Sequence, residues 1–331
     1  MKIKALFKNK KGFLIKKLLL IHNKEDKMSF DVISFGSAVI DTFVNTEIGE
    51  KNHSFSYPAG GKILIRDLKF DIGGGGTNTA VAFSRFGFKT ACICDVGDDE
   101  NGKNILNLLK KEKITFLGEI DKSGMTGYSV ILDSKEGERT ILTYKGVNNQ
   151  ITLNELNLKT LKTKWLYYSA LLEKSFATQK KLAELMHKKG TKLAFNPSSY
   201  IIKNLDFLPL LKICEVLIVN KEEAEMICKR FKKKGDLFKS IYELGPKLVL
   251  ITDKNNPAVC FDGKKKYSII PHKNIKVVER TGAGDAFASG FVAGQIAGFS
   301  IEKSLELALR ESESVIQYFG AKNKLLRMKL K

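Results

Sequence analysis

One stretch near the C-terminal end, Glu279 to Gly294 (ERTGAGDAFASGFVAG), combines small residues with a carboxylate. Gly282, Ala283 and Gly284 precede a predicted helix, so their backbone N–H groups can converge on an anion, helped by the helix dipole. Asp285 follows in the first turn. A carboxylate beside such a cradle suits phosphoryl transfer, because it can deprotonate an attacking hydroxyl while the amides hold developing charge. The alternative is a simple turn with an Asp helix cap, which the continuing run of small residues disfavours.

A second stretch, residues 71–87 (DIGGGGTNTAVAFSRFG), places four glycines before another predicted helix. A dinucleotide fingerprint needs a third glycine where this chain has Asn78 or Thr79, and no Gly-Lys-Ser/Thr occurs in the chain, so there is no P-loop. Gly74 and Gly75 would instead admit a polyol closely, and Asn78 offers its hydroxyls both a donor and an acceptor. A flexible turn before a helix is the alternative. The helix is expected to face inward with Ala80, Val81, Phe83 and Phe86.

The third stretch, Asn-Lys-Glu-Glu, follows a predicted strand at 216–219. Asn220 at the N-cap with Glu223 three residues later has the spacing of a capping box. Glu223 could equally hold a water on Mg²⁺, an ion that takes few carboxylates and several waters. The spacing alone leaves both interpretations open.

Strands and helices alternate through most of the chain, which indicates a doubly wound, mostly parallel sheet flanked by helices. Ser175 and Ser300 are placed to cap two of the helices. The first is expected to bury Phe176, Leu182, Leu185 and Met186. The predicted strands lie at 32–35, 90–94, 166–168, 193–195, 216–219 and 248–251.

Two segments break this alternation, within 40–70 and 125–147, and each predicts strands without a helix. A hairpin turn is expected at 135–138, which contains a glycine. Strand pairs inserted into an α/β frame predict a small separate β-sheet, which would act as a lid over a cleft at the carboxyl ends of the main strands. The sheet would also expose an apolar face that two copies of the chain could share as a homodimer.

Composition places the chain among ordinary globular proteins. It has 331 residues, of which 43% are hydrophobic and 28% charged, and no apolar run reaches the roughly 18 residues of a membrane span. The five cysteines form no Cys-x-x-Cys pair. They are expected to be small buried hydrophobes in a cytoplasmic protein.

The net charge of +20 is concentrated at the ends of the chain. Residues 1–27 carry nine lysines against two acids, and residues 322–331 carry five basic residues and no acid. No zinc-finger, RNA-binding or basic-zipper pattern accompanies these charges, so specific nucleic-acid binding is not expected and a solvated surface is. Residues 1–27 are interpreted as a basic extension, or as sequence ahead of a natural start at Met28. A basic helix on a membrane surface is the alternative. The main domain is expected over 28–331.

In combination, the three motifs resemble the ribokinase-like (PfkB) carbohydrate kinase family, over about residues 30–321. The resemblance implies a doubly wound α/β domain with a small β lid. It also implies transfer of the γ-phosphate of ATP to a hydroxymethyl group of a sugar or nucleoside, with Mg²⁺.

The resemblance also implies roles for single residues. Asp285 would be the catalytic base, and Gly282, Ala283 and Gly284 would form the anion hole. Asn220, Thr252 and Thr281 would serve the nucleotide and Glu223 the metal. The acceptor would meet Asp41, Gly74, Gly75, Asn78 and the lid residue Glu138.

Several positions depart from the family pattern. Glu279 and Arg280 stand where the family usually has Asp-Thr, an Asp that often helps to bind a monovalent cation, so the resemblance leaves potassium activation open. The loop at 252–257 lacks its usual glycine, Glu311 replaces a common Asn, and Asn196 replaces a frequent Asp.

The acceptor is left open by the sequence. Family resemblance favours a pentose or a nucleoside. Arg139, Lys62 and Arg66 in the predicted lid would suit a phosphorylated sugar, but are interpreted rather as solvated charges. The alternatives to a sugar kinase are a sugar-phosphate kinase of the same fold, a non-catalytic binding relative, and a nicotinamide-dependent oxidoreductase, which the missing fingerprint disfavours.

Overall fold

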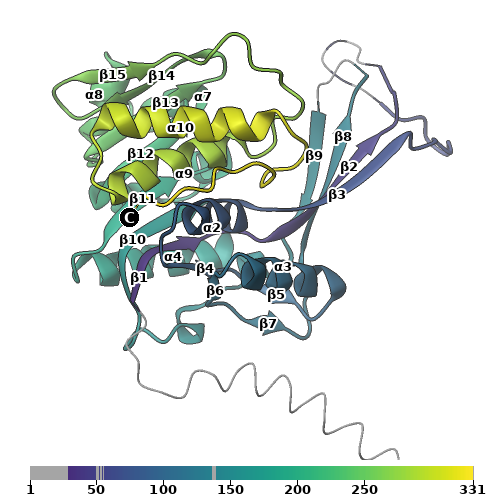
Figure 1. Ribbon diagram of the computed structural model, residues 1–331, viewed down its shortest axis with the longest axis horizontal. Helices are drawn as coiled ribbons and strands as arrows, with labels where there is room; N and C mark the ends of the chain where they lie inside the picture. The colour runs from purple at the N-terminus through teal and green to yellow at the C-terminus, as the bar shows by residue number, and fades with distance from the viewer. Residues whose placement is uncertain (1–28, 50–51, 53, 55, 136–138, 331) are drawn as a thin grey trace, which may run out of the picture. The chain divides into compact units, whose positions relative to one another are not determined.

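The structure, a computed structural model, describes residues 29–49, 52, 54, 56–135 and 139–330 (Figure 1). Phe30–Leu156 and Thr163–Lys331 form one compact unit, within which all of the side chains discussed below lie. Of the described residues, Ser29 and Asn157–Lys162 belong to a second unit. In that second unit the Asn157 carbonyl accepts hydrogen bonds from the amides of Thr160 and Leu161.

A nine-stranded sheet forms the centre of the larger unit, in the order β15-β14-β13-β12-β11-β10-β1-β4-β6. The pairings β1–β4, β4–β6 and β10 through β13 are parallel, as the alternation of strands and helices predicts. β14 and β15 add an antiparallel edge that the sequence did not indicate. The strands are β1 (Ser29–Phe35), β4 (Thr90–Ile93), β6 (Thr115–Phe116), β10 (Lys162–Ser169), β11 (Lys192–Asn196), β12 (Cys214–Asn220), β13 (Leu248–Asp253), β14 (Asn256–Phe261) and β15 (Lys266–Ile269). A short parallel pair, β5 (Val96–Gly97) and β7 (Ile120–Asp121), lies beside it.

Helices cover both faces of the central sheet. Successive side chains of its parallel strands point to opposite faces, and both sets are largely apolar, so both faces must be buried. On one face, Val32, Tyr167 and Val216 belong to the same core cluster as the apolar residues of α2, α9 and α10, and these helices lie in front of the sheet in Figure 1. The helices are α2 (Gly75–Arg85), α3 (Glu100–Lys111), α4 (Glu173–His187), α5 (Ser199–Asn204), α6 (Leu208–Lys212), α7 (Lys221–Arg230), α8 (Leu237–Tyr242), α9 (Ala283–Ile296) and α10 (Ile301–Ile316), with 3₁₀ turns η2 (Gly146–Asn149) and η3 (Leu153–Glu155).

The two predicted helix caps have different outcomes. Ser300 is the N-cap of α10 and accepts a hydrogen bond from the Lys303 amide, as expected. The prediction for Ser175 is wrong, because α4 already begins at Glu173 and its N-cap is Leu172. The Ser175 hydroxyl instead donates to the Asn148 carbonyl and accepts from the Ile151 amide, so it ties η2 to α4. Leu185, expected on the buried face, is 41% exposed.

A four-stranded sheet, separate from the central one, contains β2 (Val39–Asn45), β3 (Asp67–Gly73), β8 (Gly127–Asp133) and β9 (Arg139–Tyr144) in the order β3-β2-β8-β9. It projects beside α2 and α10 in Figure 1 and is called the lid below. Within the first segment predicted as strands, 40–70, the second strand begins only at Asp67 and continues beyond it to Gly73, because its pairing with β2 starts at the Asn45–Asp67 pair. Of the predicted turn at 135–138, residues 136–138 lie outside the described residues.

The segment after α10 returns across the molecule and connects the lid, α2 and α10. The Phe319 ring packs against Phe43 of the lid with centroids 4.6 Å apart. Farther on, the amides of Met328 and Leu330 donate to the carbonyls of Arg85 and Phe86 at the end of α2. This basic terminus is therefore built into the fold over its described length.

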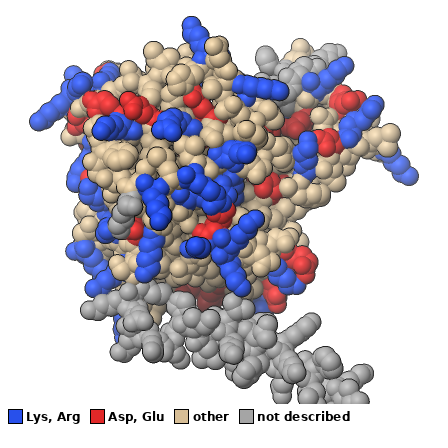
Figure 2. Space-filling model, in the orientation of Figure 1, with Lys and Arg blue, Asp and Glu red and all other residues tan. Residues whose placement is uncertain are grey.

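The surface charge is spread over the face shown in Figure 2, where lysines and arginines alternate with acids instead of gathering into one stripe. Among the described residues, the structure contains no helix long and apolar enough to span a membrane. The cysteines are free thiols, as expected, and all are buried except Cys228, which is half-buried.

Candidate active site

Asp285 lies in the first turn of α9, where the chain enters the helix through a left-handed residue. Gly282 is the N-cap with φ of +81°, and a Cβ at this position would lie 2.4 Å from the Cβ of Ala321. Only glycine fits there. A Cβ on Gly284 would meet nothing within 4 Å, so the backbone at that residue faces open space.

The amides at the start of α9 are not equally available. The Ala283 amide donates to the Arg280 carbonyl at 3.2 Å. Within the described part of the chain, no protein acceptor lies within hydrogen-bond distance of the Gly282 and Gly284 amides. These two amides are therefore the donors that an anion at the helix N-terminus would meet.

Asn78 of α2 joins the glycine-rich motif to Asp285. Its Nδ2 donates to Asp285 Oδ2 at 2.7 Å, across 207 residues of sequence. Burial raises the pKa of Asp285, while the Asn78 hydrogen bond and the nearby Lys322 ammonium act to lower it. Since Oδ2 is occupied, Oδ1 is the oxygen left to take a proton from an acceptor.

The glycines of the second motif allow α2 to approach the carboxyl ends of β1 and β10. A Cβ on Gly75 would lie 2.6 Å from both Cβ and Oγ of Ser169 and 3.5 Å from Asp285 Oδ1. The motif is therefore a close-packed junction and not a flexible turn. Ser169 was missed by the sequence reasoning, although it ends a parallel strand, where ligands bind in this kind of sheet. Its Oγ is buried and has no partner among the described residues.

Two carboxylates from the lid face the same region. Asp41 of β2 is opposite Asp71 of β3 in the antiparallel register. Asp41 is buried, and its carboxylate fills the space that a side chain at Gly73 would need, 1.8 Å from the ideal Cβ. Burial raises the pKa of Asp41, and the Asp71 and Asp285 charges add to the rise, whereas a Ser129 hydrogen bond and Lys322 oppose it.

Lys322, from the segment after α10, is the cation at this site that sequence reasoning did not identify. Only 5% of it is exposed, so the interpretation of the terminal lysines as solvated is wrong for this one. Its ammonium donates to Asn78 Oδ1 and to the Ile72 carbonyl. Burial lowers the pKa of Lys322 to about 8, although Asp71, Asp41 and Asp285 act in the opposite direction.

Arg139 connects the lid to the loop ahead of the anion site. Its Nη1 donates to Glu279 Oε1 at 2.5 Å and to Thr281 Oγ1 at 2.6 Å. Glu279 Oε1 also accepts from the amides of Arg280 and Thr281. Arg139, interpreted from the sequence as a solvated charge, is therefore paired.

The expected nucleotide residues end two neighbouring strands. Asn220 and Thr252 are partners in the parallel register of β12 and β13. Asn220 and Glu223 form the capping box that their spacing indicated, with the Glu223 amide donating to Asn220 Oδ1 at 2.8 Å. β12 is two strands away from β10, so the two ends are separated by roughly 10 Å at the usual strand spacing.

A magnesium ion fits the residues around Glu223 only if waters and phosphates supply most of its ligands. The Glu223 carboxylate is buried and already accepts from the Asn220 amide at 3.1 Å and from Ser199 Oγ at 3.4 Å. The described residues contain no cluster of three acids, histidines or cysteines able to hold a metal. One carboxylate acting through water is the arrangement that Mg²⁺ accepts beside phosphates.

The remaining sequence-based expectations have mixed outcomes. Glu138 lies outside the described residues. Glu311 is fully buried and accepts from the Leu326 amide at 2.8 Å, so it holds the C-terminal segment. Asn196 donates to the Ile218 carbonyl and links β11 to β12. In the loop without a glycine, Lys254 takes the left-handed conformation with φ of +51°.

A shallow hollow of about 340 Å³ between η3 and α4 shares no residue with this site and contains no acid or histidine. The hollow is therefore separate from the cluster around Asp285.

The geometry defines a class of protein: a doubly wound sheet with a β lid and an aspartate at an anion-binding helix terminus. The pfkB family carbohydrate kinase pattern matches residues 29–327. The chain belongs to this family, and it is an ATP-dependent sugar or nucleoside kinase with a ribokinase-like fold.

Individual relatives agree with this placement. The chain is 28% identical over 254 residues to an uncharacterized sugar kinase of Archaeoglobus fulgidus, covering 75% of this chain and 99% of that protein. It is 26% identical over 311 residues to an ATP-dependent 6-phosphofructokinase of Thermoanaerobacterium thermosaccharolyticum, covering 89% and 91%. The crystal structure of the Methanocaldococcus jannaschii nucleoside kinase superposes with a TM-score of 0.77 at 21% identity, covering 91% and 95%.

Proposed function

We propose that this kinase transfers the γ-phosphate of ATP to the hydroxymethyl group of an uncharged sugar or nucleoside, with Asp285 as the base. The observation that carries the proposal is the Asn78–Asp285 hydrogen bond, which brings the glycine-rich junction and the anion-binding helix terminus to one point. An acceptor hydroxyl between them would have a carboxylate on one side and backbone amides on the other.

The chemistry follows from this placement. Asp285 Oδ1 takes the proton of the acceptor hydroxyl, whose oxygen forms a bond to the γ-phosphorus. The bond from that phosphorus to the oxygen bridging to the β-phosphate breaks, and ADP leaves with that oxygen. The Gly282 and Gly284 amides and the α9 dipole stabilise the charge on the transferring phosphoryl oxygens. Proton and phosphoryl group therefore pass in one displacement.

Nucleotide and metal are assigned to the strand ends beside this point. Asn220, Thr252 and Thr281 would contact the nucleotide, and Glu223 would hold Mg²⁺ through water. When bound, the ion would neutralise phosphate charge and help to orient the γ-phosphate for in-line attack. The carboxyl ends of β12 and β10 lie about two strand spacings apart, a separation that would suit an extended phosphate chain.

The charges around the acceptor support an uncharged substrate over a phosphorylated one. Asp41, Asp71 and Asp285 face Lys322, and Lys145 faces Asp41, so the acids outnumber the lysines. The lid cations named from the sequence do not alter this balance. Arg139 is paired with Glu279, Arg66 with Glu47 on the surface, and Lys62 is exposed.

We also infer that two copies of the chain pair through the outer faces of their lids. Leu68 and Phe70 of β3 and Leu142 and Tyr144 of β9 are all between 47% and 60% exposed. The strand register places Phe70, Thr42, Val130 and Leu142 in one row across the sheet. An exposed apolar sheet face of this kind marks a surface for association.

The test is ADP release from ATP and Mg²⁺ over a panel of ribose, fructose, adenosine and inosine, together with ribose 5-phosphate and fructose 6-phosphate. Turnover on an unphosphorylated acceptor is expected to exceed turnover on its phosphate. The reverse preference would overturn the uncharged acceptor. Acceptor-induced thermal stabilisation without ADP release from any acceptor would identify a non-catalytic binding relative instead.

A further inference from the structure

Lys322 belongs neither to the glycine-rich stretch at 71–87 nor to the stretch at 279–294 that contains Asp285. It comes from the segment after α10, lies 244 residues from Asn78 in sequence, and is nearly fully buried beside it. A buried ammonium is retained only where it is paired and hydrogen-bonded. The ammonium donates to the Ile72 carbonyl and Asn78 Oδ1, and the nearby carboxylates of Asp71, Asp41 and Asp285 favour its charged form.

The contact with Lys322 sets the direction of the Asn78 amide. An asparagine side chain has one accepting and one donating end. Lys322 has only donors, so it requires the oxygen of Asn78 on its own side and thereby turns Nδ2 toward Asp285. With the amide reversed, its oxygen would face the Asp285 carboxylate and its nitrogen would face the ammonium. Neither contact could form.

The charges around Lys322 come from four elements. Asp71 of β3, Asp41 of β2 and Asp285 of α9 favour the charged form of Lys322, and Arg85 of α2 disfavours it. One ammonium thus lies near three carboxylates. It acts to lower the pKa of Asp41 and of Asp285. Burial lowers the pKa of Lys322 to about 8, so the lysine is predominantly charged at neutral pH.

We propose that Lys322 is a positioning residue, which fixes the Asn78 amide so that it donates to Asp285 and which places a positive charge near the Asp285 carboxylate. The proposal rests on the proposed function through the role of Asp285 as the base. Lys322 donates to Asn78, and we assign its effect on the reaction to Asn78 and Asp285.

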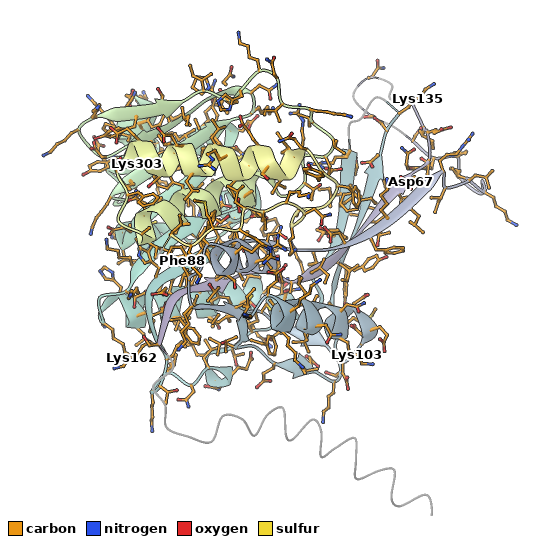
Figure 3. The ribbon with its side chains drawn as sticks, in the orientation of Figure 1. Asp67, Phe88, Lys103, Lys135, Lys162 and Lys303 are labelled. Carbon is orange, nitrogen blue, oxygen red and sulfur yellow. The ribbon has the colours of Figure 1, made fainter. Side chains whose placement is uncertain are left out.

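The kinetic test uses Lys322→Met, with Lys322→Gln as a second uncharged variant in case the first does not fold. Lys303→Met is the matched control, because Lys303 is exposed near the N-terminal end of α10, far from the lid in Figure 3. A misplaced base costs about 10- to 100-fold in rate, so kcat is expected to fall by that factor in the Lys322 variants only. Retention of kcat in both variants would overturn the proposal.

The pH profile separates positioning from a general loss of structure. The acid limb of kcat/KM reports the free enzyme's base. Without the neighbouring ammonium, which acts to lower the Asp285 pKa, that pKa rises, so this limb is expected to move to higher pH. Lys322→Arg, which restores a charge, should return the limb toward its original position. An unmoved limb in Lys322→Met would contradict the proposal.

A third measurement does not depend on turnover. Asp285→Asn is introduced into the parent and into Lys322→Met, and the melting temperatures of the four proteins are compared. With Lys322 present, the change removes an attraction. Without it, the change relieves repulsion among the three carboxylates. Asp285→Asn is therefore expected to be less favourable in the parent background.

The outcomes distinguish the two proposals. Equal changes in melting temperature in both backgrounds would overturn the Lys322 proposal even if the kinase is active. A parent protein that turns over no acceptor would overturn the proposed function, while unequal changes would still support the link between Lys322 and Asp285.

Discussion

Asn78 shows how one amide can order a catalytic group. Its nitrogen donates to Asp285 and its oxygen accepts from Lys322, so three residues from α2, α9 and the C-terminal segment depend on one side-chain orientation. Hydrogen-bond networks of this type are sensitive to each member, because a partner removed from a buried site leaves the others unpaired. The site is therefore specified by complementary donors and acceptors.

Glu311 is a buried carboxyl group, and its titration is expected to make the stability of the fold depend on pH. It is fully buried, its Oε1 has no partner among the described residues, and burial raises its pKa to about 8. Between about pH 4.5 and pH 8 the folded protein thus binds a proton that the unfolded chain has released. The free energy of unfolding is expected to fall as the pH rises through this window.

Glu311→Gln removes this titration and should flatten the fall. At pH 8 the variant is expected to be more stable than the parent by on the order of 2–4 kcal/mol, and the difference should shrink toward pH 5. Urea unfolding at both pH values measures it, with the exposed Glu306→Gln on the same helix as the control. Parallel pH profiles for parent and Glu311→Gln would contradict the account.

At the scale of elements, the lid and the anion-binding loop are joined by one ion pair. Arg139 of β9 contacts both Glu279 and Thr281. These two residues come shortly before Gly282, which has the left-handed conformation. The pair is only partly exposed, at 30% for the arginine and 14% for the glutamate side chain. Lid position and the conformation of the loop are thereby coupled.

Arg139→Met should lower kcat/KM for the acceptor by roughly tenfold, equivalent to about 1.4 kcal/mol, because both the lid and the loop lose a fixed position. Arg66→Met is the matched control, since its pair with Glu47 is exposed on both sides and such pairs contribute about 0–1 kcal/mol. Glu279→Gln combined with Arg139→Met should cost less than the sum of the single changes. Steady-state kinetics of the parent, Arg139→Met, Glu279→Gln and the double variant provide the check. Strictly additive losses in kcat/KM would count against coupling between the two residues.

The sequence predicts the elements whose signals are local. The parallel strands, the Ser300 cap and the lid strands follow from periodicity and turn residues, and the junction of α2 follows from contiguous glycines. Ser175 was misread because its hydroxyl satisfies η2, a contact between separate segments. The antiparallel edge of β14 and β15 carries no alternation with helices that would have identified it.

The position of Lys322 and the pairing of Arg139 could not be predicted from the sequence for a related reason. Each contacts a residue far away in the chain, as in the 244 residues between Lys322 and Asn78 and the 140 between Arg139 and Glu279. Lysine in a basic terminus is usually solvated, so its type gives no signal. The motifs around Asp285 and Asn78 were recognisable because small residues and polar groups are adjacent in sequence. That they would share a hydrogen bond required the fold.

At the scale of the whole molecule, the C-terminal segment has a structural function. Arg327 pairs with Glu112, which also pairs with Arg85, and the Phe319 ring packs on the lid. Part of the positive charge that the sequence assigns to this terminus is therefore neutralised inside the fold. The outer lid face, by contrast, exposes the apolar side chains of Leu68, Phe70, Leu142 and Tyr144.

Replacing Phe70 and Leu142 together with lysine should convert the protein from a dimer to a monomer without lowering its melting temperature by more than a few degrees. Both side chains are more than half exposed, and charges on an exposed sheet face oppose pairing. Light scattering after size exclusion gives the mass. Leu185→Lys, on the exposed side of α4, is the control, and a parent that is already monomeric would disprove lid pairing.

The most direct measurement of the central claim is the rate of phosphoryl transfer by Asp285→Asn, compared with the parent and with Asp98→Asn, an exposed aspartate. Asp285→Asn is expected to lose at least about 10²–10⁴-fold in kcat, while its affinity for ATP stays close to that of the parent and its melting temperature falls only slightly. Asp98→Asn should remain fully active. An Asp285→Asn protein that keeps most of its activity would contradict the claim that this carboxylate is the base.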